Sequence, residues 1–300
     1  MVGVMETLIL IQTLVSGLLI GFIFSLIAVG LTLIFGVMEI VNFAHGEFLM
    51  LAMYIAYWLY APPPEGFLHG FSLDPLFATP LCAAVLFGVG VLTYKTIIAR
   101  ILDAPMLAQI FATFGLMVFM RSAAQFLWTP DYRLVKEPLL AGRVDLGGIF
   151  IGLPQLVASL GAIVTTGFVY WFITKTELGT ALRATAEDKE AAVLMGINTE
   201  WMYTLAWGIG AACVGVAGGL LAMFYYIYPE VGSVFALTAF VIVALGGFGS
   251  ITGAFVAGIL IGLVETLSGL LGSPAFKLIP VYVIYLGVVL LRPKGLFGEF

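Results

Sequence analysis

Charged residues are scarce in this chain of 300 residues. Asp, Glu, Lys and Arg together make up 10% of the sequence, whereas soluble domains contain about 25%. Apolar residues make up 62%, and the mean hydropathy is +1.15. This composition excludes an ordinary soluble domain, and the apolar stretches are long enough to cross a bilayer. The sequence therefore predicts an all-α fold, a polytopic transmembrane helical bundle that forms a single domain over residues 1–300.

Cysteines and catalytic motifs are also scarce. The two cysteines, Cys82 and Cys213, lie in separate apolar segments, which argues against a disulfide framework and against a metal site. The chain lacks the G-x-x-x-x-G-K-[ST] loop that binds ATP, and it lacks a nucleophile elbow, a zinc motif and a catalytic carboxylate pair. Its net charge of −5 argues against nucleic-acid binding. We expect neither an enzyme nor a bound cofactor.

Apolar runs follow one another along the chain and predict about eight or nine crossings. They cover residues 8–35, 48–60, 77–96, 107–127, 149–174, 202–228, 234–245, 251–271 and 278–291. The second run is too short to span alone, so we expect it to borrow residues from the polar segment before it. The first run follows no Lys or Arg and no clear cleavage site, which favours a retained helix over a signal peptide. Glycine pairs spaced by four predict close helix contacts; they are Gly17 and Gly21, Gly215 and Gly219, and Gly258 and Gly262.

Basic residues between the runs favour one side of the membrane. Those on the predicted cytoplasmic side are Lys95, Arg100, Lys175, Arg183, Lys189, Arg292 and Lys294. The proline-rich segment at 61–75 and the segment at 229–233 have none, so we expect both outside. The segment at 128–148 is an exception, because it carries three basic residues on the predicted outer side. The carboxyl terminus is expected in the cytoplasm, and the amino terminus outside if the number of crossings is odd.

The segment at 175–200 is a compact charged island between two apolar runs. Thr185-Ala186-Glu187-Asp188 has the form of a capping box, and Gly196 is a natural helix terminator. The pattern predicts a free-standing helix of about three turns over 186–196, with Leu194 and Met195 on an apolar face. Two interpretations stay open for that face: it packs on this chain's own helix ends, or it inserts into a groove of a soluble partner.

A polar segment separates the first two apolar runs. Its residues are Glu39, Asn42, His45, Gly46 and Glu47. Polar groups at membrane depth are costly and face a bundle interior or a water cavity, so we expect the first helix to break here. The two glutamates are candidate pathway residues, or the segment only holds the break. We favour the structural role for Asn42 and His45, which would satisfy freed backbone groups. Metal binding by His45 is not expected, because no second ligand lies at a suitable spacing.

Two further features lie near the carboxyl terminus. Gly246, Gly247 and Gly249 lie in the run GGFGS, which predicts either a hinge between half-helices or a tight hairpin. Glu265 is an isolated acid within an apolar run and is by default a functional candidate. An ion pair with a residue such as Arg121, or an interfacial position, would explain it equally well.

Several motifs resemble one family of transporters. Glu190 to Gly196 matches E-A-A-x-x-x-G, which resembles the cytoplasmic loop by which bacterial ABC import permeases contact their ATPase. Asn42 to Glu47 reads N-F-A-H-G-E and resembles the signature of the permeases for branched-chain amino acids, a family that includes urea permeases. The GGFGS run and the closing RPKGLFG, at 292–298, follow in the matching order. The resemblance covers nearly the whole chain.

The resemblance implies a transmembrane permease subunit of an ABC importer in the inner membrane, with alternating access driven by ATP hydrolysis on partner chains. It implies two ATPase subunits, a second similar permease subunit and an extracytoplasmic solute-binding protein, with lipid around the helices. The expected coupling loop at 175–200 would contact the ATPases through Glu187, Asp188, Glu190, Ala191, Ala192 and Gly196. The alternative is a proton- or ion-coupled secondary transporter that uses Glu39, Glu47 and Glu265. It would import without ATP and would leave the docking helix unexplained.

Overall fold

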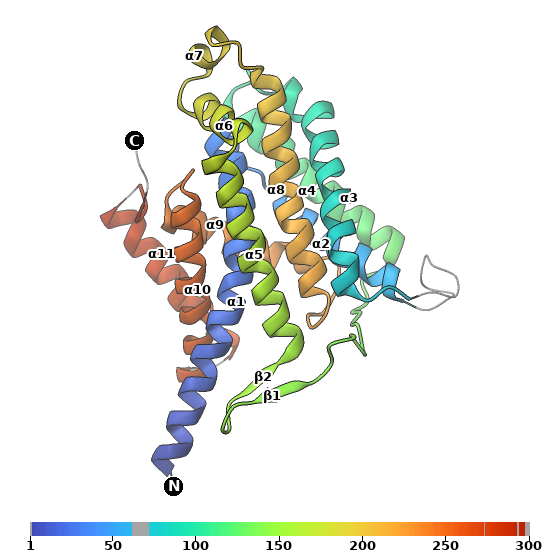
Figure 1. Ribbon diagram of the computed structural model, residues 1–300, viewed down its shortest axis with the longest axis vertical. Coiled ribbons are helices and arrows are strands. Elements are labelled where there is room, and N and C mark those ends of the chain that lie inside the picture. The colour runs from blue at the N-terminus through green and yellow to red at the C-terminus, as the bar shows by residue number, and fades with distance from the viewer. Residues whose placement is uncertain (1, 62–71, 273, 293, 298–300) are drawn as a thin grey trace.

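The computed structural model describes residues 2–61, 72–272, 274–292 and 294–297 (Figure 1). Within them the regular secondary structure is helical apart from one small hairpin, and loops join the elements. The helices are α1 (Val2–Met38), α2 (His45–Tyr60), α3 (Pro75–Thr96), α4 (Met106–Trp128), α5 (Leu153–Lys175), α6 (Glu177–Glu187), α7 (Lys189–Leu194), α8 (Thr199–Leu221), α9 (Val231–Gly246), α10 (Ile251–Leu271) and α11 (Ile279–Leu291). Short 3-10 helices cover η1 (Ile98–Arg100) and η2 (Pro274–Phe276). Most of the predicted outside loop at 61–75, including His69, and Pro293 of the closing motif lie outside the described residues.

Six helices in the described part of the chain are long and apolar enough to cross a membrane: α1, α3, α4, α5, α8 and α10. Two shorter apolar helices, α9 and α11, accompany them. The protein is therefore a polytopic, helical membrane protein, as the composition predicts.

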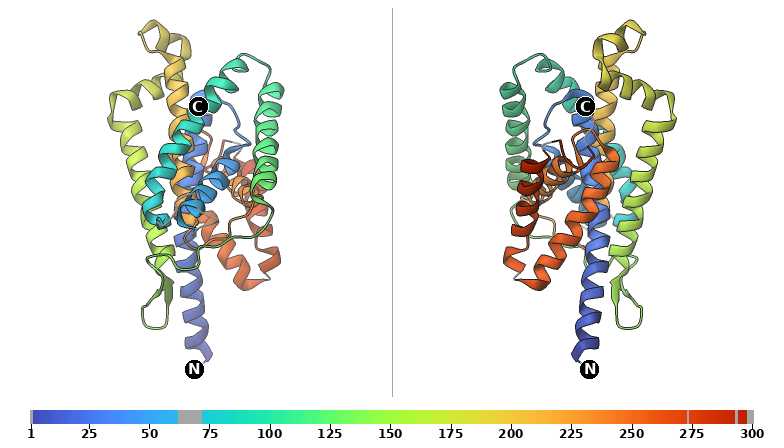
Figure 2. Two further views of the ribbon diagram at one scale, coloured as in Figure 1. Left: turned by 90° about the vertical axis from the view of Figure 1, so that its right-hand side faces the viewer. Right: turned by 90° about the vertical axis from the view of Figure 1, so that its left-hand side faces the viewer.

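Two helices form the centre of the bundle. α1 and α8 are the most deeply buried of the long helices and pack against each other, while α10 packs along α1 and α3 packs along α8. α4 contributes little buried surface and lies at the edge (Figure 2). Because lipid surrounds such a bundle, the many exposed apolar side chains of the outer helices are the expected surface and not a defect.

Small residues allow the central helices to approach closely, as the glycine spacing predicts. A Cβ atom on Gly21 would lie 2.9 Å from the Cα of Ile259, and one on Gly215 would lie 2.9 Å from the Cα of Ala83. Where α1 meets α10, the Ser25 hydroxyl donates to the carbonyl of Phe255 at 2.8 Å. Such contacts drive helix association in lipid, where apolar burial alone does not.

The hairpin corrects one predicted boundary. β1 (Arg143–Asp145) pairs antiparallel with β2 (Phe150–Gly152), so the helix expected from residue 149 begins at Leu153. The amide of Gln12 on α1 donates to the carbonyl of Phe150 and accepts from its N–H. α1 is about 55 Å long at the usual rise per residue, which exceeds the hydrocarbon core of a bilayer. Its amino-terminal end extends beside this hairpin (Figure 2).

Candidate functional site

The charged island forms a lobe at one end of the molecule. α6 and α7 lie at the same end as the end of α11, and the start of α1 lies at the opposite end (Figure 1). Side chains cap the amino-terminal ends of the helices in and next to this lobe. The Thr176 hydroxyl accepts from the N–H of Gly179 at the start of α6, and the Asn198 side chain accepts from the N–H of Trp201 at the start of α8.

The predicted capping box is wrong. Thr185 is buried inside α6, where its hydroxyl donates to the carbonyl of Ala181, so it caps nothing. The cap of α7 is Asp188, whose Oδ1 accepts from the N–H groups of Glu190 and Ala191 at 2.9 Å each. The island therefore contains two helices joined at Asp188 in place of one helix over 186–196. Gly196 does end the second helix, with φ of +83°.

The α7 tip, residues 188–196, divides the predicted apolar face into an inner and an outer part. Ala192 is buried, whereas Leu194 is 88% exposed and Met195 is 82% exposed. Lys189 places its ammonium group 5.9 Å from the ring centre of Tyr203 on α8, which ties the tip to the bundle. Asp188, Glu190 and Ala191 of the tip are exposed like Leu194 and Met195, and so is Glu187 at the end of α6.

The chain breaks after α1, where the polar segment predicts it. Glu39 has φ of +58° and is exposed, and its N–H closes the last turn of α1 on Phe35. The Asn42 side chain accepts from the N–H of Ala44 at 3.1 Å. The ring Nε2 of His45 lies 3.0 Å from the carbonyl of Ile27 on α1. Asn42 thus bonds a backbone group at the break, whereas His45 bonds one farther back within α1.

Glu47 forms an ion pair within the bundle. Arg121 on α4 donates to its Oε1 from Nη2 at 2.5 Å and from Nε at 3.2 Å. The Glu47 side chain is 1% exposed and that of Arg121 is 25% exposed. An unpaired charge at this depth would be costly, so each group stabilises the other.

The first turns of α2 and α9 meet beside this pair. A Cβ atom on Gly46 would collide with the carbonyl oxygen of Gly232, and one on Gly232 would lie 2.5 Å from the carbonyl oxygen of Gly46. Glu47 lies at the same crossing, 2.9 Å from that Gly232 position. Both helices begin at this internal crossing. Each has 16 residues and is therefore shorter than a full span.

The glycine run forms a tight turn between α9 and α10. Gly247 and Gly249 adopt φ of +102° and +84°, and the Ser250 hydroxyl caps α10 by accepting from the N–H of Gly253. The described carboxyl-terminal residues pack on this turn: the N–H groups of Leu296 and Phe297 donate to the last carbonyls of α9. The turn also contacts the end of α1, where the rings of Phe35 and Phe248 lie 4.4 Å apart.

A further polar group lies at the opposite half of the bundle. Glu265 accepts a hydrogen bond of 2.5 Å from Lys277, so Arg121 is not its partner as the sequence allowed. Lys277 directly follows the short helix η2, and it was not identified from the sequence as a partner of Glu265. The available signal was an acid within α10 and a base just after the turn that follows this helix. The structure thus places the predicted residues in separate regions: the α7 tip, the helix break, the glycine turn and the Glu265 pair.

Comparison with known proteins agrees with these features. Residues 13–291 match the family model described as the branched-chain amino acid transport system / permease component. The chain is 30% identical to the high-affinity branched-chain amino acid transport system permease protein BraD of Pseudomonas aeruginosa and 31% identical to its counterpart LivH of Escherichia coli K12. Each match covers 96% of this chain and 95% of the relative. The probable branched-chain amino acid transport permease LivH of Methanocaldococcus jannaschii is 29% identical over 91% of this chain and 88% of its own.

No solved structure matches the chain. The family model, however, covers most of the residues that build the bundle, from residue 13 within α1 to the end of α11. This chain belongs to the family of permease components of branched-chain amino acid transport systems.

Proposed function

We propose that this chain is the membrane-spanning subunit of an ATP-driven importer that moves branched-chain amino acids across the inner membrane by alternating access. The match to the permease family along nearly the whole chain carries this proposal, together with the transport function in the names of BraD and LivH. Its partners are two ATPase subunits, a second homologous permease subunit and an extracytoplasmic binding protein. ATP hydrolysis takes place on the ATPase subunits.

The α7 tip is the proposed contact with the ATPase. Leu194 and Met195 are large, apolar and exposed, and they lie on a short helix that is held at both ends by Asp188 and Gly196. An amphipathic helix of this kind can place its apolar residues in a groove of a partner. Glu187, Glu190 and Ala191, nearby in the chain, are exposed as well.

Nine membrane passes follow from this assignment. They are α1, α2, α3, α4, α5, α8, α9, α10 and α11, with α2 and α9 as the two short passes that begin inside the bundle. The α6–α7 lobe and the carboxyl terminus would face the cytoplasm and the amino terminus the outside, because an odd number of passes puts the termini on opposite sides (Figure 1). The hairpin β1–β2 then lies outside.

Proton- or ion-coupled transport is less well supported. Glu47 and Glu265, the two acids that are buried among the described residues, each form an ion pair with a basic side chain, and Glu39 is exposed at the end of α1. This function would give the exposed α7 tip no role.

The test is co-purification of the importer from membranes, followed by leucine uptake in proteoliposomes with and without ATP. Leu194→Asp should abolish co-purification of the ATPase subunits while the second permease subunit stays bound. Leu146→Asp is the matched control, because Leu146 is an exposed leucine in the hairpin turn at the other end. Normal ATPase binding by Leu194→Asp would refute the docking assignment, and leucine uptake by the chain alone without ATP would refute the importer.

A further inference from the structure

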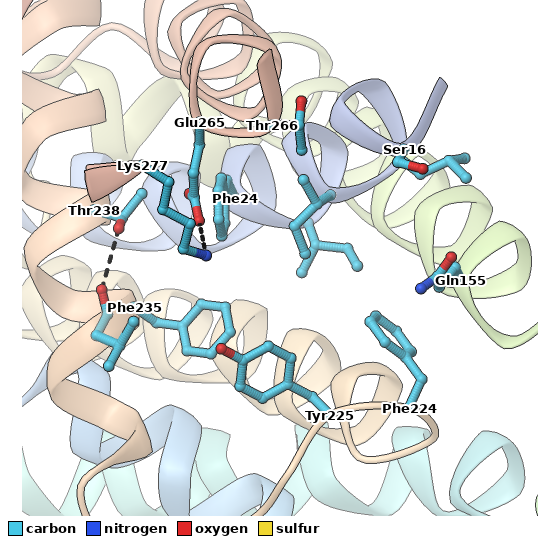
Figure 3. A pocket seen from close by; sticks show the side chains of 14 residues that line it. Ser16, Phe24, Gln155, Phe224, Tyr225, Phe235, Thr238, Glu265, Thr266 and Lys277 are labelled. Atoms are coloured by element: carbon cyan, nitrogen blue, oxygen red, sulfur yellow. Dashed lines mark hydrogen bonds and ion pairs between the residues drawn. The ribbon is translucent and has the colours of Figure 1, made fainter. Parts of the chain in front are cut away.

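A cavity of about 320 Å³ lies in the half of the bundle away from the α6–α7 lobe. Figure 3 shows the side chains that line it. It lies between α1, α9, α10 and the segment that follows α8. Aromatic side chains form much of its wall, namely Phe24, Phe224, Tyr225 and Phe235. The cavity is at the lower end of the size range of small-molecule sites, about 300–1,000 Å³, and such sites combine apolar walls with a few converging polar groups.

The polar groups of this cavity are an acid and a base. Lys277 donates to Oε1 of Glu265 across the cavity wall, and both side chains point inward with the aromatic rings opposite them (Figure 3). The other carboxylate oxygen of Glu265, Oε2, is buried and has no hydrogen-bond partner among the described residues. A lysine ammonium has three donors, and its bond to Glu265 uses one of them. The Lys277 side chain is 44% exposed, so its remaining donors are accessible.

We propose that this cavity binds the zwitterion of an α-amino acid during transport. The ammonium of Lys277 pairs with the carboxylate of the solute, and the carboxylate of Glu265, which lines the cavity, accepts from the ammonium of the solute. The solute's branched side chain lies against the aromatic wall. This inference rests on the proposed function and deepens it, because it names the atoms that recognise the solute class.

Charge balance supports this assignment. The Glu265–Lys277 pair is neutral as a whole, and so is the zwitterion, so binding adds no net charge to a low-dielectric region. The rings of Tyr225 and Phe235, 5.2 Å apart between centroids, supply an apolar contact and a π-face for the ammonium. Urea and simple amides carry no opposite charges that would match the pair.

The site also lies where an importer needs it. With the α6–α7 lobe in the cytoplasm, the cavity opens in the outer half, on the side where a binding protein delivers its solute. Its wall includes Val234 and Thr238 from the short helix α9, which ends at the glycine turn on the other side. A solute held here therefore touches a helix that reaches the cytoplasmic half.

The test is leucine uptake by the complete importer in proteoliposomes. Lys277→Met and Glu265→Gln should each raise the KM for leucine by about tenfold or more, as expected when a charge-assisted hydrogen bond is lost. Lys136→Met, at an exposed lysine of the outer loop, is the control and should keep the wild-type KM.

A second experiment measures occupancy of the cavity by leucine directly, and it remains informative if a variant importer assembles poorly and transports little. Ser16 lines the cavity, and the native Cys82 and Cys213 are buried, so Ser16→Cys supplies a selective label for a thiol reagent. Leucine should slow this labelling in the otherwise wild-type importer, and Lys277→Met should remove the protection.

Two results would overturn the inference while the proposed function stands: wild-type KM values in both variants, or no protection of the cysteine at position 16 in an importer that transports leucine. A wild-type importer that transports urea and no amino acid would instead refute the proposed substrate, and the zwitterion site with it.

Discussion

Replacing Arg121 with methionine should cost the protein more stability than replacing Arg121 and its partner Glu47 together. The single change leaves the Glu47 carboxylate at 1% exposure without its cation, and breaking a buried pair costs about 3–5 kcal/mol. Arg121 is 25% exposed, so its own charge is better solvated, and Glu47→Gln should cost about 1–2 kcal/mol. The double variant removes both charges and should resemble Glu47→Gln, which gives a coupling energy of about 3–5 kcal/mol, equal to the cost of Arg121→Met alone.

The free energy of unfolding can be measured by SDS titration in mixed micelles, followed by tryptophan fluorescence. Arg183→Met is the control, because Arg183 is exposed on α6 and should change the free energy by no more than about 0.5 kcal/mol. The reasoning is refuted if the effects of Arg121→Met and Glu47→Gln add to within about 0.5 kcal/mol in the double variant. In that case the two side chains do not depend on each other, despite their contact.

Three further changes test the helix crossing, the lobe and the turn. Gly46→Ala should destabilise the purified protein by about 1–3 kcal/mol, because the added methyl group meets the backbone of Gly232. Gly88→Ala is the control and should be neutral or slightly stabilising, because nothing lies within 4 Å of the added Cβ atom. Thermal unfolding followed by size exclusion compares the two variants. Asp188→Ala should speed amide exchange in α7 by about fivefold, because it removes a cap worth about 1 kcal/mol, and unchanged exchange would contradict the cap assignment. Gly247→Ala should lower the thermal midpoint, since φ of +102° strains any other residue by at least about 1 kcal/mol; an unchanged midpoint would show that the turn relaxes.

Apolar runs and glycine spacing are local signals, and they predicted most of the fold. The break after α1 and the start of α2 at His45 follow from polar groups that cannot remain inside an unbroken apolar helix. The hairpin at Arg143–Asp145 was missed because strands of three residues carry almost no periodic signal. Its pairing depends on the neighbouring strand and on Gln12, which lies far away in the sequence.

The candidate site was harder to predict because its features depend on tertiary contacts. Thr185 and Asp188 are both good cap residues, and the choice between them depends on the burial of Thr185 against the bundle. Glu265 was recognised as a candidate from its isolation, but sequence alone cannot say which cation reaches it. Arg121 pairs with Glu47, and Lys277 reaches Glu265 because η2 folds back beside the end of α10.

The close contact between α1 and α10 has a consequence for how the protein is made. Ser25 and its acceptor Phe255 are 230 positions apart in the chain. At a synthesis rate of about 5–20 residues per second, the small-residue face of α1 waits on the order of 10–50 s for its partner. During that interval, Gly17 and Gly21 face lipid or another protein in the membrane. A ribosome that stalls before α10 therefore releases a chain whose central helix is unpaired along one side, and such a chain is a natural substrate for membrane quality control.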